Sequence, residues 1–436
     1  MQTINRTALF RASCLSLLVT SLSFGIRAGI LTDQGVRFHL SASQLGTIAA
    51  TAFWGFPLAI IVGGFIVDLI GMKKLLVCAF IFHLVGIVLT IFADGYWTLF
   101  FSTLLIGIAN GTVEASCNPL VASLYTDNKT TKLNHFHLWF PAGIVIGTLV
   151  VFGLDRVLTP VGVEKPYWVS QVEIATMLIP TLIYGYLFSK LKFPVTERVA
   201  SGVSTGDMYK ALINPLFGFM IICMFGTAIT ELFTNQWTDV LFKTVTNNAI
   251  LILTFVASMQ VLGRAFAAPV VHRLAPQGVL LISAILSALG IYLMVHLHGE
   301  AIFFAAFIFG LGVAFFWPCM IGFVSENLPR TGAVGLNLMG GAGMFGVSIY
   351  MIFMGGYYDK ILAAKLPAGA SVDAYRSAAA GTDMAKVYDT ARSAAGPEVL
   401  SSTLIIPVVL IIAFGGLVIY MRSRKKTEPL KTAAAA

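Results

Sequence analysis

Charged residues are scarce in this sequence. Asp, Glu, Lys and Arg make up only 11% of its 436 residues, whereas 57% are hydrophobic and the mean hydropathy is +0.86. A water-soluble domain carries about 25% charged residues, which cover its surface. The shortage of charge therefore excludes a water-soluble protein.

Cysteine pairs and catalytic motifs are also lacking. The five cysteines fall within apolar runs and form no C-x-x-C pair, so we expect apolar fillers and neither disulfides nor a metal site. The sequence has no Walker A loop, no H-E-x-x-H and no G-x-S-x-G. These absences predict that the chain is not an enzyme and has no cofactor. The net charge of +8 is not accompanied by a nucleic-acid-binding motif, so we expect no nucleic-acid partner.

Long apolar runs dominate the chain. A helix needs about 20 apolar residues to cross a bilayer, and these runs are too long and too continuous for the alternating strands of a β-barrel. We predict an all-α membrane protein with twelve transmembrane helices, near residues 9–31, 45–69, 75–93, 97–121, 136–154, 170–189, 212–234, 248–270, 278–296, 301–323, 333–356 and 402–421. Lys and Arg are more frequent in the loops on the side of the two termini. The positive-inside rule therefore predicts cytoplasmic termini and a multi-pass protein of the cell membrane, the inner membrane if the source is bacterial.

The predicted spans divide into two halves. Residues 190–207 are basic and rich in Gly and Ser, which indicates a cytoplasmic linker between a six-helix bundle at 1–189 and another at 208–436. Similar stretches at 64–74 and 263–273 favour an internal duplication. The polar segment 359–400 is interpreted as a mobile outside connector with a short helix around Met384 to Ala394.

A conspicuous motif follows the second span. Gly64, Asp68, Gly71 and Lys73 form the pattern G-x-x-x-D-x-x-G-x-K. Small residues let helices approach closely, and an acid at a helix end can pair with a neighbouring helix N-terminus. The pattern indicates a helix–helix contact that locks a short loop.

Span four carries polar residues at helical spacing. Asn110, Glu114 and Asn118 recur every four residues and therefore share one helix face. An ionisable group at the centre of a membrane helix costs roughly 2.5 to 3.5 kcal/mol on insertion scales, so this face must meet protein or water. Glu114 is interpreted either as a proton-accepting acid in a cavity or as a structural carboxyl bonded to a neighbouring helix.

Together these motifs resemble the major facilitator superfamily. The run from Glu114 to Pro119, with Leu133-Asn134, Glu231 and Trp237, Gly263-Arg264, and Trp317-Pro318, is similar to the fucose–galactose–glucose:proton symporter branch. The resemblance implies the major facilitator fold, with the Gly64–Lys73 motif as a gate. It also implies sugar uptake driven by an ion gradient, with Glu114 as the coupling or sugar-binding carboxylate.

One feature departs from that branch. Relatives of the fucose carrier have a second acid in span one, whereas here no Asp or Glu precedes Asp33 and Arg27 lies within the span. We hypothesise that Arg27 pairs with Glu114 in some states. The alternative is that Arg27 extends its charge to the outer surface.

Further polar side chains are candidate cavity residues. His135 and Trp139 lie one turn apart and offer a hydrogen bond and an aromatic face, as a sugar requires. In span seven, Glu231 and Asn235 share a face near Trp237. Two single intramembrane amides, Gln260 and Asn337, are predicted either to line the cavity or to bond between helices.

The sequence thus predicts a monomeric secondary active transporter in the lipid bilayer that takes up a sugar or sugar derivative by alternating access. Proton symport is the preferred mechanism, with Glu114, Arg27 and Glu231 as coupling residues. Sodium-coupled symport and a multidrug-type exporter on the same fold are the alternatives.

Overall fold

A computed structural model describes residues 4–40, 42–160, 163, 165–235, 249–297, 299–376, 378 and 381–427. These residues are overwhelmingly helical, and no strand occurs among them. Eleven helical segments in the described ranges are long and apolar enough to cross a membrane. The predicted span at 248–270 corresponds to a further helix, α13, which has 17 described residues and is not one of these eleven. The predicted all-α membrane architecture is confirmed.

The first six spans form the N-terminal bundle. Its helices are α1 (Arg6–Arg37), α2 (Ala42–Ile70), α3 (Met72–Ile91), α4 (Tyr96–Leu124), α5 (Lys129–His137), α6 (Trp139–Leu158), α7 (Tyr167–Ala175) and α8 (Leu178–Lys190). Spans five and six are each interrupted, as α5 with α6 and α7 with α8. In the turn between α2 and α3, Gly71 adopts a φ of +87°, a conformation that glycine reaches without the Cβ penalty.

The remaining spans form the C-terminal bundle. They are α11 (Pro215–Ala228) with the π-helix η1 (Ile229–Phe233), α13 (Ala249–Ala265), α14 (Ala267–His296), α15 (Ala301–Val313), α16 (Phe316–Asn327), the 3-10 helix η2 (Pro329–Thr331), α17 (Gly332–Lys365), α18 (Val372–Arg376), α19 (Asp383–Thr403) and α20 (Ile405–Thr427). Span ten is interrupted as α15 and α16. The linker carries two short helices, α9 (Glu197–Ala200) and α10 (Thr205–Leu212).

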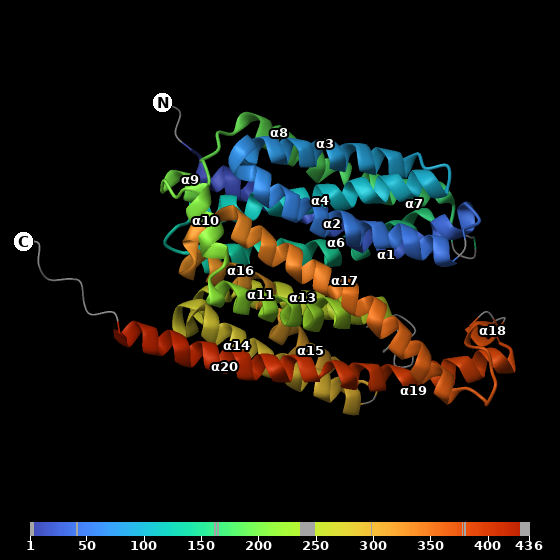
Figure 1. Cartoon of the computed structure of the whole chain (residues 1–436). Coiled ribbons are helices and arrows are strands. Elements are labelled where there is room, and N and C mark those ends of the chain that lie inside the picture. Colours follow the sequence, from blue (N-terminus) through green and yellow to red (C-terminus); the bar gives the residue numbers. More distant parts are fainter. Residues whose placement is uncertain are drawn as a thin grey trace, which may run out of the picture.

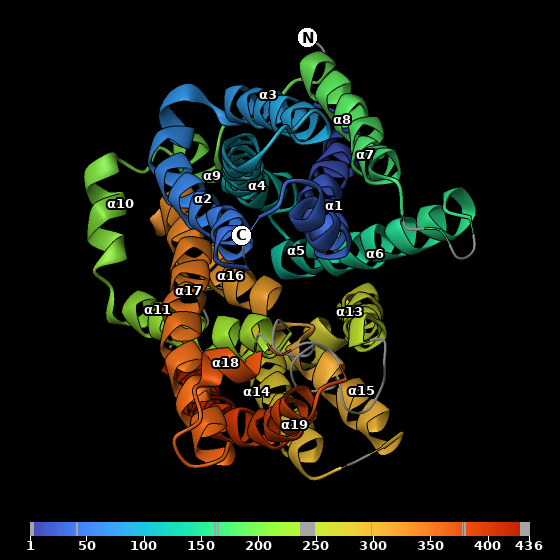
Figure 2. The ribbon, with the colours of Figure 1, turned by 90° about the vertical axis from the view of Figure 1, so that its right-hand side faces the viewer.

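The two bundles lie side by side (Figures 1 and 2). They meet where α2 packs on α17, where α6 packs on α13, and where α5 packs on α16. The contact between α2 and α17 is close, because a Cβ added to Gly64 would lie 2.6 Å from the Cβ of Asn337. Glycine is therefore required where these helices cross.

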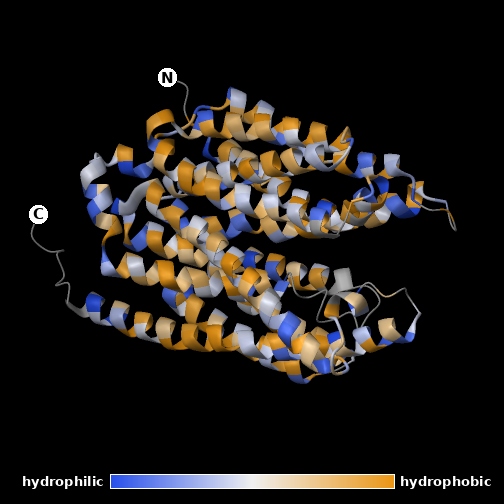
Figure 3. Ribbon diagram, turned by 45° about the vertical axis from the view of Figure 1, so that its right-hand side comes forward, coloured by the Kyte–Doolittle hydropathy of each residue, from blue (hydrophilic) through white to orange (hydrophobic). Residues whose placement is uncertain are grey.

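The two ends of the molecule differ. Helix α1 begins and α20 ends at the same end as α9 and α10, which we call the terminal end (Figure 1). Helices α18 and α19 lie toward the opposite end. Orange, hydrophobic residues dominate the long helices, and blue ones are more frequent toward their ends (Figure 3). Large apolar side chains such as Ile352 and Ile412 are exposed, which suits contact with lipid tails.

The segment 359–400 is mostly helical, whereas the sequence predicts a connector with one short helix. Helix α17 continues to Lys365, and α19 extends over Asp383–Thr403. Thr382 caps α19 by accepting a hydrogen bond from the backbone N–H of Ala385 at 3.2 Å. Ala395 and Val399 are buried in a small apolar cluster with residues of α17. This packing explains why the polar, alanine-rich segment folds.

Candidate functional site

A small cavity lies at the centre of the molecule, between the two bundles. Its volume is about 30 Å³. The N-terminal half contributes Phe56, Glu114, His137 and Phe140, and the C-terminal half contributes Glu231, Leu232, Arg264, Trp317 and Met344. We call this the central cavity. Two carboxylates, a guanidinium, an imidazole and an indole thus meet at the interface between the bundles.

Glu114 is the acid of the N-terminal half. It is 2% exposed, and Asn118, one turn along α4, donates a hydrogen bond to its Oε2 at 3.1 Å. The amide oxygen of Asn118 is 2.9 Å from Nε2 of His137. Because that oxygen only accepts, Nε2 of His137 carries the proton in this arrangement. Glu114, Asn118 and His137 therefore form one hydrogen-bonded chain from α4 to α5.

Arg264 is the cation of the central cavity and contacts both halves. Its Nη2 donates to Oε1 of Glu231 at 3.0 Å, and its Nη1 donates to the carbonyl of His137 at 2.7 Å. Its Nε donates to the carbonyl of Ala314 at 2.6 Å. Arg264 is 2% exposed and Glu231 is 5% exposed. The guanidinium thus holds the carboxylate of its own half and a backbone oxygen of the other.

Prolines make both carbonyls available to Arg264. Residue 141 is a proline, so it has no N–H for the carbonyl of His137, four residues before it. Pro318 likewise has no N–H for the carbonyl of Ala314, four residues before it. Each proline interrupts its span, between α5 and α6 or between α15 and α16. The two breaks therefore supply the acceptors that a buried guanidinium needs.

A third proline is used in the same way. Pro119 in α4 has no N–H for the carbonyl of Ala115, and that oxygen accepts a hydrogen bond from Nδ2 of Asn337 in α17 at 3.0 Å. Asn337 is fully buried. The bond joins the two bundles beside the close approach of Gly64. The contacts of Arg264 with His137 and of Asn337 with Ala115 thus both join the bundles through backbone acceptors that proline has released.

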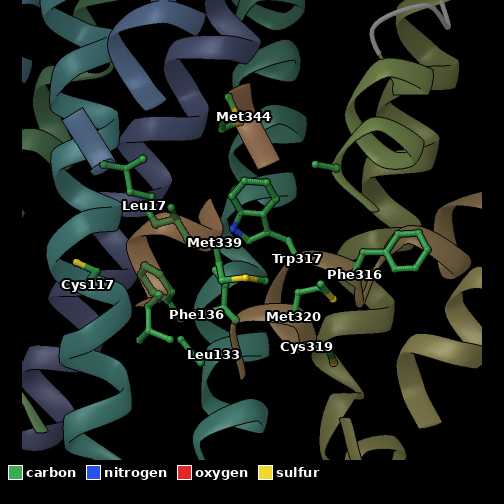
Figure 4. Packing of buried hydrophobic residues seen from close by; sticks show 14 of the residues in the cluster. Leu17, Cys117, Leu133, Phe136, Phe316, Trp317, Cys319, Met320, Met339 and Met344 are labelled. Atoms are coloured by element: carbon green, nitrogen blue, oxygen red, sulfur yellow. The ribbon is translucent and has the colours of Figure 1, made fainter. Parts of the chain in front are cut away.

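Trp317 projects into the centre of the apolar packing, close to Met339 and Met320 (Figure 4). Its ring lies against α17, where an added Cβ at Gly343 would be 3.0 Å from the indole. In the described part of the chain, Nε1 of Trp317 and Oε2 of Glu231 are buried without hydrogen-bond partners. Buried polar atoms seldom stay unpaired. Oε2 of Glu231 is therefore free to accept from a ligand in the central cavity, and Nε1 of Trp317 is free to donate to a ligand or to the neighbouring carboxylate of Glu114.

The charges of the central cavity do not balance when both acids are ionised. Glu231 is paired with Arg264, whereas Glu114 accepts a hydrogen bond from Asn118 but has no ion pair among the described residues. A lone carboxylate inside a membrane protein is costly, and a bound proton removes that cost. Glu114 is therefore the group most readily neutralised by a proton or a cation.

Two predicted site residues of the N-terminal half lie elsewhere. Asn110 accepts from His83 at 2.7 Å and donates to Ser23 at 3.1 Å, inside the N-terminal bundle. Arg27 lies in a second cavity within this bundle, and its guanidinium carbon is 6.0 Å from the ring centre of Phe24. The hypothesised pairing of Arg27 with Glu114 is absent from the described contacts of this conformation.

The other described candidates do not line the central cavity. His135 and Trp139 are half-buried. Asn235 and Gln260 each have a buried amide atom without a partner in the described ranges, Oδ1 and Nε2 respectively. Trp237 lies outside the described residues.

The predicted gate motif lies at the terminal end. Asp68 accepts hydrogen bonds from Nε of Arg198 at 2.6 Å and from the hydroxyl of Thr196 at 2.5 Å, both in the linker. Lys73 donates to the carbonyls of Ser189 and Leu191, at 2.8 and 3.1 Å, at the end of α8. The motif therefore fixes the linker and the last helix of the N-terminal bundle.

Of the nine residues that line the central cavity, the sequence predictions include only Glu114 and Glu231. The sequence points to His135 and not to His137, and Arg264 and Trp317 enter only through the family resemblance. A usable signal was the proline four residues after His137, because it predicts a break in the helix and a free carbonyl. The structure buries Arg264 between the bundles, where it contacts both of them.

The fold and the site define an integral membrane protein in which two helical bundles enclose a polar, ionisable centre. The chain belongs to the Major Facilitator Superfamily, whose sequence profile matches residues 13–349. The predicted family is confirmed. Because this is a family of transporters, the prediction that the chain is not an enzyme is confirmed too.

Individual relatives are distant. A TsgA homolog from Buchnera aphidicola (subsp. Schizaphis graminum) is 25% identical over 200 residues, which are 45% of this chain and 49% of the relative. The chain thus spans about half the length of this curated relative, and less of others. The E. coli fucose:proton symporter FucP covers 92% of this chain and 98% of its own, with 18% identity and a TM-score of 0.64. The proton:xylose symporter XylE covers 90% and 94%, with 15% identity and a TM-score of 0.69. These structures are similar in fold.

Proposed function

We propose that the protein is a secondary active transporter that takes up a sugar or sugar derivative together with a proton. The observation that carries the proposal is the central cavity, in which two buried carboxylates and an indole from opposite bundles face one another. Transporters of this kind bind their substrate near the bilayer midplane, between two bundles that rock against each other. The proposal is supported by the chemistry of the lining residues and by their position between the two bundles. The similar fold of two sugar:proton symporters agrees with it.

The lining suits a polyhydroxylated solute. Oε2 of Glu231 and Nε1 of Trp317 are unpaired within the described structure, so they offer an acceptor and a donor to hydroxyl groups. The indole also offers an apolar face for the C–H side of a sugar ring. A cavity of about 30 Å³ has room for only one or two water molecules, so a sugar requires the bundles to separate. The polar lining argues against a multidrug-type exporter.

Glu114 is the proposed coupling residue. It contributes an unbalanced charge to the central cavity, and protonation would let the loaded carrier change state without a buried lone charge. Asn118 and His137 orient it, since they form one hydrogen-bonded chain. A sodium ion could supply the same neutralisation, and the tests below include that case.

The terminal end is proposed to be cytoplasmic. The sequence places its Lys- and Arg-rich loops there, and the positive-inside rule favours that orientation. The membrane would be the cell membrane, the inner membrane in a bacterium.

The first experiment is sugar binding by the purified protein. We expect a mono- or disaccharide from a panel to quench the fluorescence of Trp317, and we expect the Trp317→Phe variant to lose this signal. The panel is run at two pH values, with and without sodium. A response to sodium at constant pH would assign the coupling to sodium. A panel in which only lipophilic cations bind would overturn the sugar assignment.

The second experiment is transport by proteoliposomes with the Glu114→Gln variant. We expect accumulation driven by a pH gradient to be lost, whereas counterflow of the sugar persists because it needs no net proton movement. The matched control is Glu173→Gln, since Glu173 is also a buried acid of the N-terminal bundle but pairs with Lys165 away from the central cavity. Gradient-driven uptake and counterflow that both continue at wild-type rates in Glu114→Gln would sink the coupling role.

A further inference from the structure

A second polar cavity lies inside the N-terminal bundle, apart from the central cavity. It has a volume of about 20 Å³, which is room for one water-sized particle. Its lining comes from α1, α3, α4, α7 and the residue before α8, and its polar members are Ser23, Arg27, Gln34, Thr90 and Thr103. None of the described lining residues is an acid. The proposed transport mechanism does not use this cavity.

Arg27 brings a positive charge into this cavity without a matching acid. Among the described residues it has no ion pair or hydrogen bond, and its guanidinium lies over the ring of Phe24. The acids Asp33 and Glu173 of the same bundle both pair with Lys165 at 2.9 Å, and neither of them lines this cavity. An unpaired guanidinium within a membrane helix is costly, so a counter-charge is expected.

Gln34 is an independent sign of a missing acceptor. It lies two turns after Arg27 on α1, is 3% exposed, and lines the same cavity. Its Nε2 has no hydrogen-bond partner in the described structure. The hydroxyls of Ser23 and Thr90 are occupied as donors, because they bond to the carbonyls of Thr20 and Gly86. Two separate donors, one charged and one neutral, therefore line a space to which the described residues contribute no acid.

We propose that this cavity is a binding site for a small monovalent anion of the size of chloride, held by Arg27 and Gln34. A monatomic anion fits the available volume and neutralises the guanidinium. It also accepts hydrogen bonds from several directions, as this pair of donors requires. A carboxylate or phosphate group on a larger solute does not fit a space of this volume. The anion occupies the interior of one bundle and is distinct from the transported solute.

The experiment measures chloride binding by the purified full-length protein. Radioactive chloride is titrated by scintillation proximity, and thermal unfolding is followed in sodium chloride and in sodium gluconate of equal ionic strength. We expect saturable chloride binding and a higher unfolding temperature in chloride. Arg27→Gln should weaken binding at least tenfold and remove the chloride-dependent shift. Gln34→Leu, which keeps the charge, should weaken binding by a smaller factor.

The matched control is Arg37→Gln. Arg37 is an exposed arginine on the same helix, and its guanidinium lies 5.6 Å from the ring centre of Tyr167. This variant should bind chloride within twofold of wild type. If Arg27→Gln does not fold, Gln34→Leu and Arg27→Lys supply the comparison. The proposal is overturned if the wild type shows no saturable chloride binding, or if Arg27 and Gln34 variants bind as well as the wild type.

Discussion

At the scale of single residues, Arg264 is the most constrained side chain of the site. Three of its nitrogens donate to three acceptors from two bundles, and two of those acceptors are backbone carbonyls. A lysine could not reproduce this pattern, because it has one nitrogen where arginine has a planar fork. The geometry therefore fixes both the position and the identity of the residue.

We predict that Arg264→Gln strongly destabilises the protein. The change leaves Glu231 as a buried charge without a counter-ion, a situation that costs about 3 to 5 kcal/mol when one partner of a buried pair is removed. The measurement is thermal unfolding in detergent, with the double variant Arg264→Gln/Glu231→Gln alongside. The double variant should recover part of the loss, because its buried charge is gone.

The control for this prediction is Arg376→Gln. Arg376 pairs with Asp359 at 2.7 Å, but both side chains are about half exposed. An exposed pair contributes at most about 1 kcal/mol, so this variant should unfold close to the wild type. If Arg264→Gln were as stable as this control, the buried pair would not hold the site together.

Some residues of the site could be predicted from sequence and others could not. The spacing of Glu114 and Asn118 predicts a shared face, and both belong to one hydrogen-bonded chain. Asn110 lies two turns before Asn118, and eight residues turn a helix by about 80° beyond full turns. That drift points Asn110 into its own bundle, toward His83. Which of these polar residues line a cavity depends on the positions of the neighbouring helices. The spacing of residues in the sequence does not give those positions.

At the scale of helices, the breaks at Pro141 and Pro318 explain the choice of cavity residues. A continuous helix through span five predicts His135 and Trp139 on the cavity face. The interruption at Leu138 separates α5 from α6, so His137 lines the cavity instead. Periodicity is reliable only within an unbroken helix. The effect of a break on the helices around it requires tertiary packing.

We predict that Pro318→Ala slows transport. An N–H at residue 318 could donate to the carbonyl of Ala314, which in the wild type accepts from Nε of Arg264. The competition would straighten span ten and loosen Arg264, so we expect about a tenfold lower rate of sugar counterflow in proteoliposomes. Thermal stability should change little, because one hydrogen bond replaces another.

Pro397→Ala is the control for this prediction. Pro397 also lies inside a helix, α19, but this helix does not line the central cavity. Its replacement should leave counterflow unchanged. Equal slowing by both variants would show that helix straightening in general, and not the contact of Arg264 with Ala314, limits the rate.

The full length of the helical segment 383–403 could not be predicted from the sequence alone. Its apolar residues Ala391, Ala395 and Val399 recur every four positions, which is a helical pattern. The composition is nevertheless polar and rich in alanine, so the sequence of this segment predicts only a short helix. Its order depends on the apolar side of α17, against which these residues pack.

At the scale of the whole molecule, polar contacts join the two halves at the terminal end. Lys129, at the start of α5, pairs with Glu197 of the linker at 2.7 Å and donates to the carbonyl of Ser325 in α16 at 3.1 Å. Its neighbour Thr130 donates from its backbone and its hydroxyl to Glu326, at 2.9 and 2.6 Å. The N-terminal bundle, the linker and the C-terminal bundle are therefore tied together at one point.

We predict that Lys129→Met favours a state in which the terminal end is open. The change removes the ion pair and the bond to Ser325, and it leaves Glu197 without its partner. Spin labels at Lys74 and His272, one exposed position on each bundle, report the separation when the exposed Cys78 is replaced by serine. We expect the distance distribution to gain a longer component, because a ligand-free carrier exchanges between states that differ by a few kcal/mol.

The control for this prediction is Lys386→Met. Lys386 also pairs with an acid, Asp383, but both are largely exposed and lie on α19, away from the terminal end. Its removal should leave the distance distribution as in the wild type. If Lys129→Met also left it unchanged, the contacts around Lys129 would not hold the terminal end closed. The close approach of α2 to α17 at Gly64 would then be the contact that decides between states, and Gly64→Val would be the variant that opens this end.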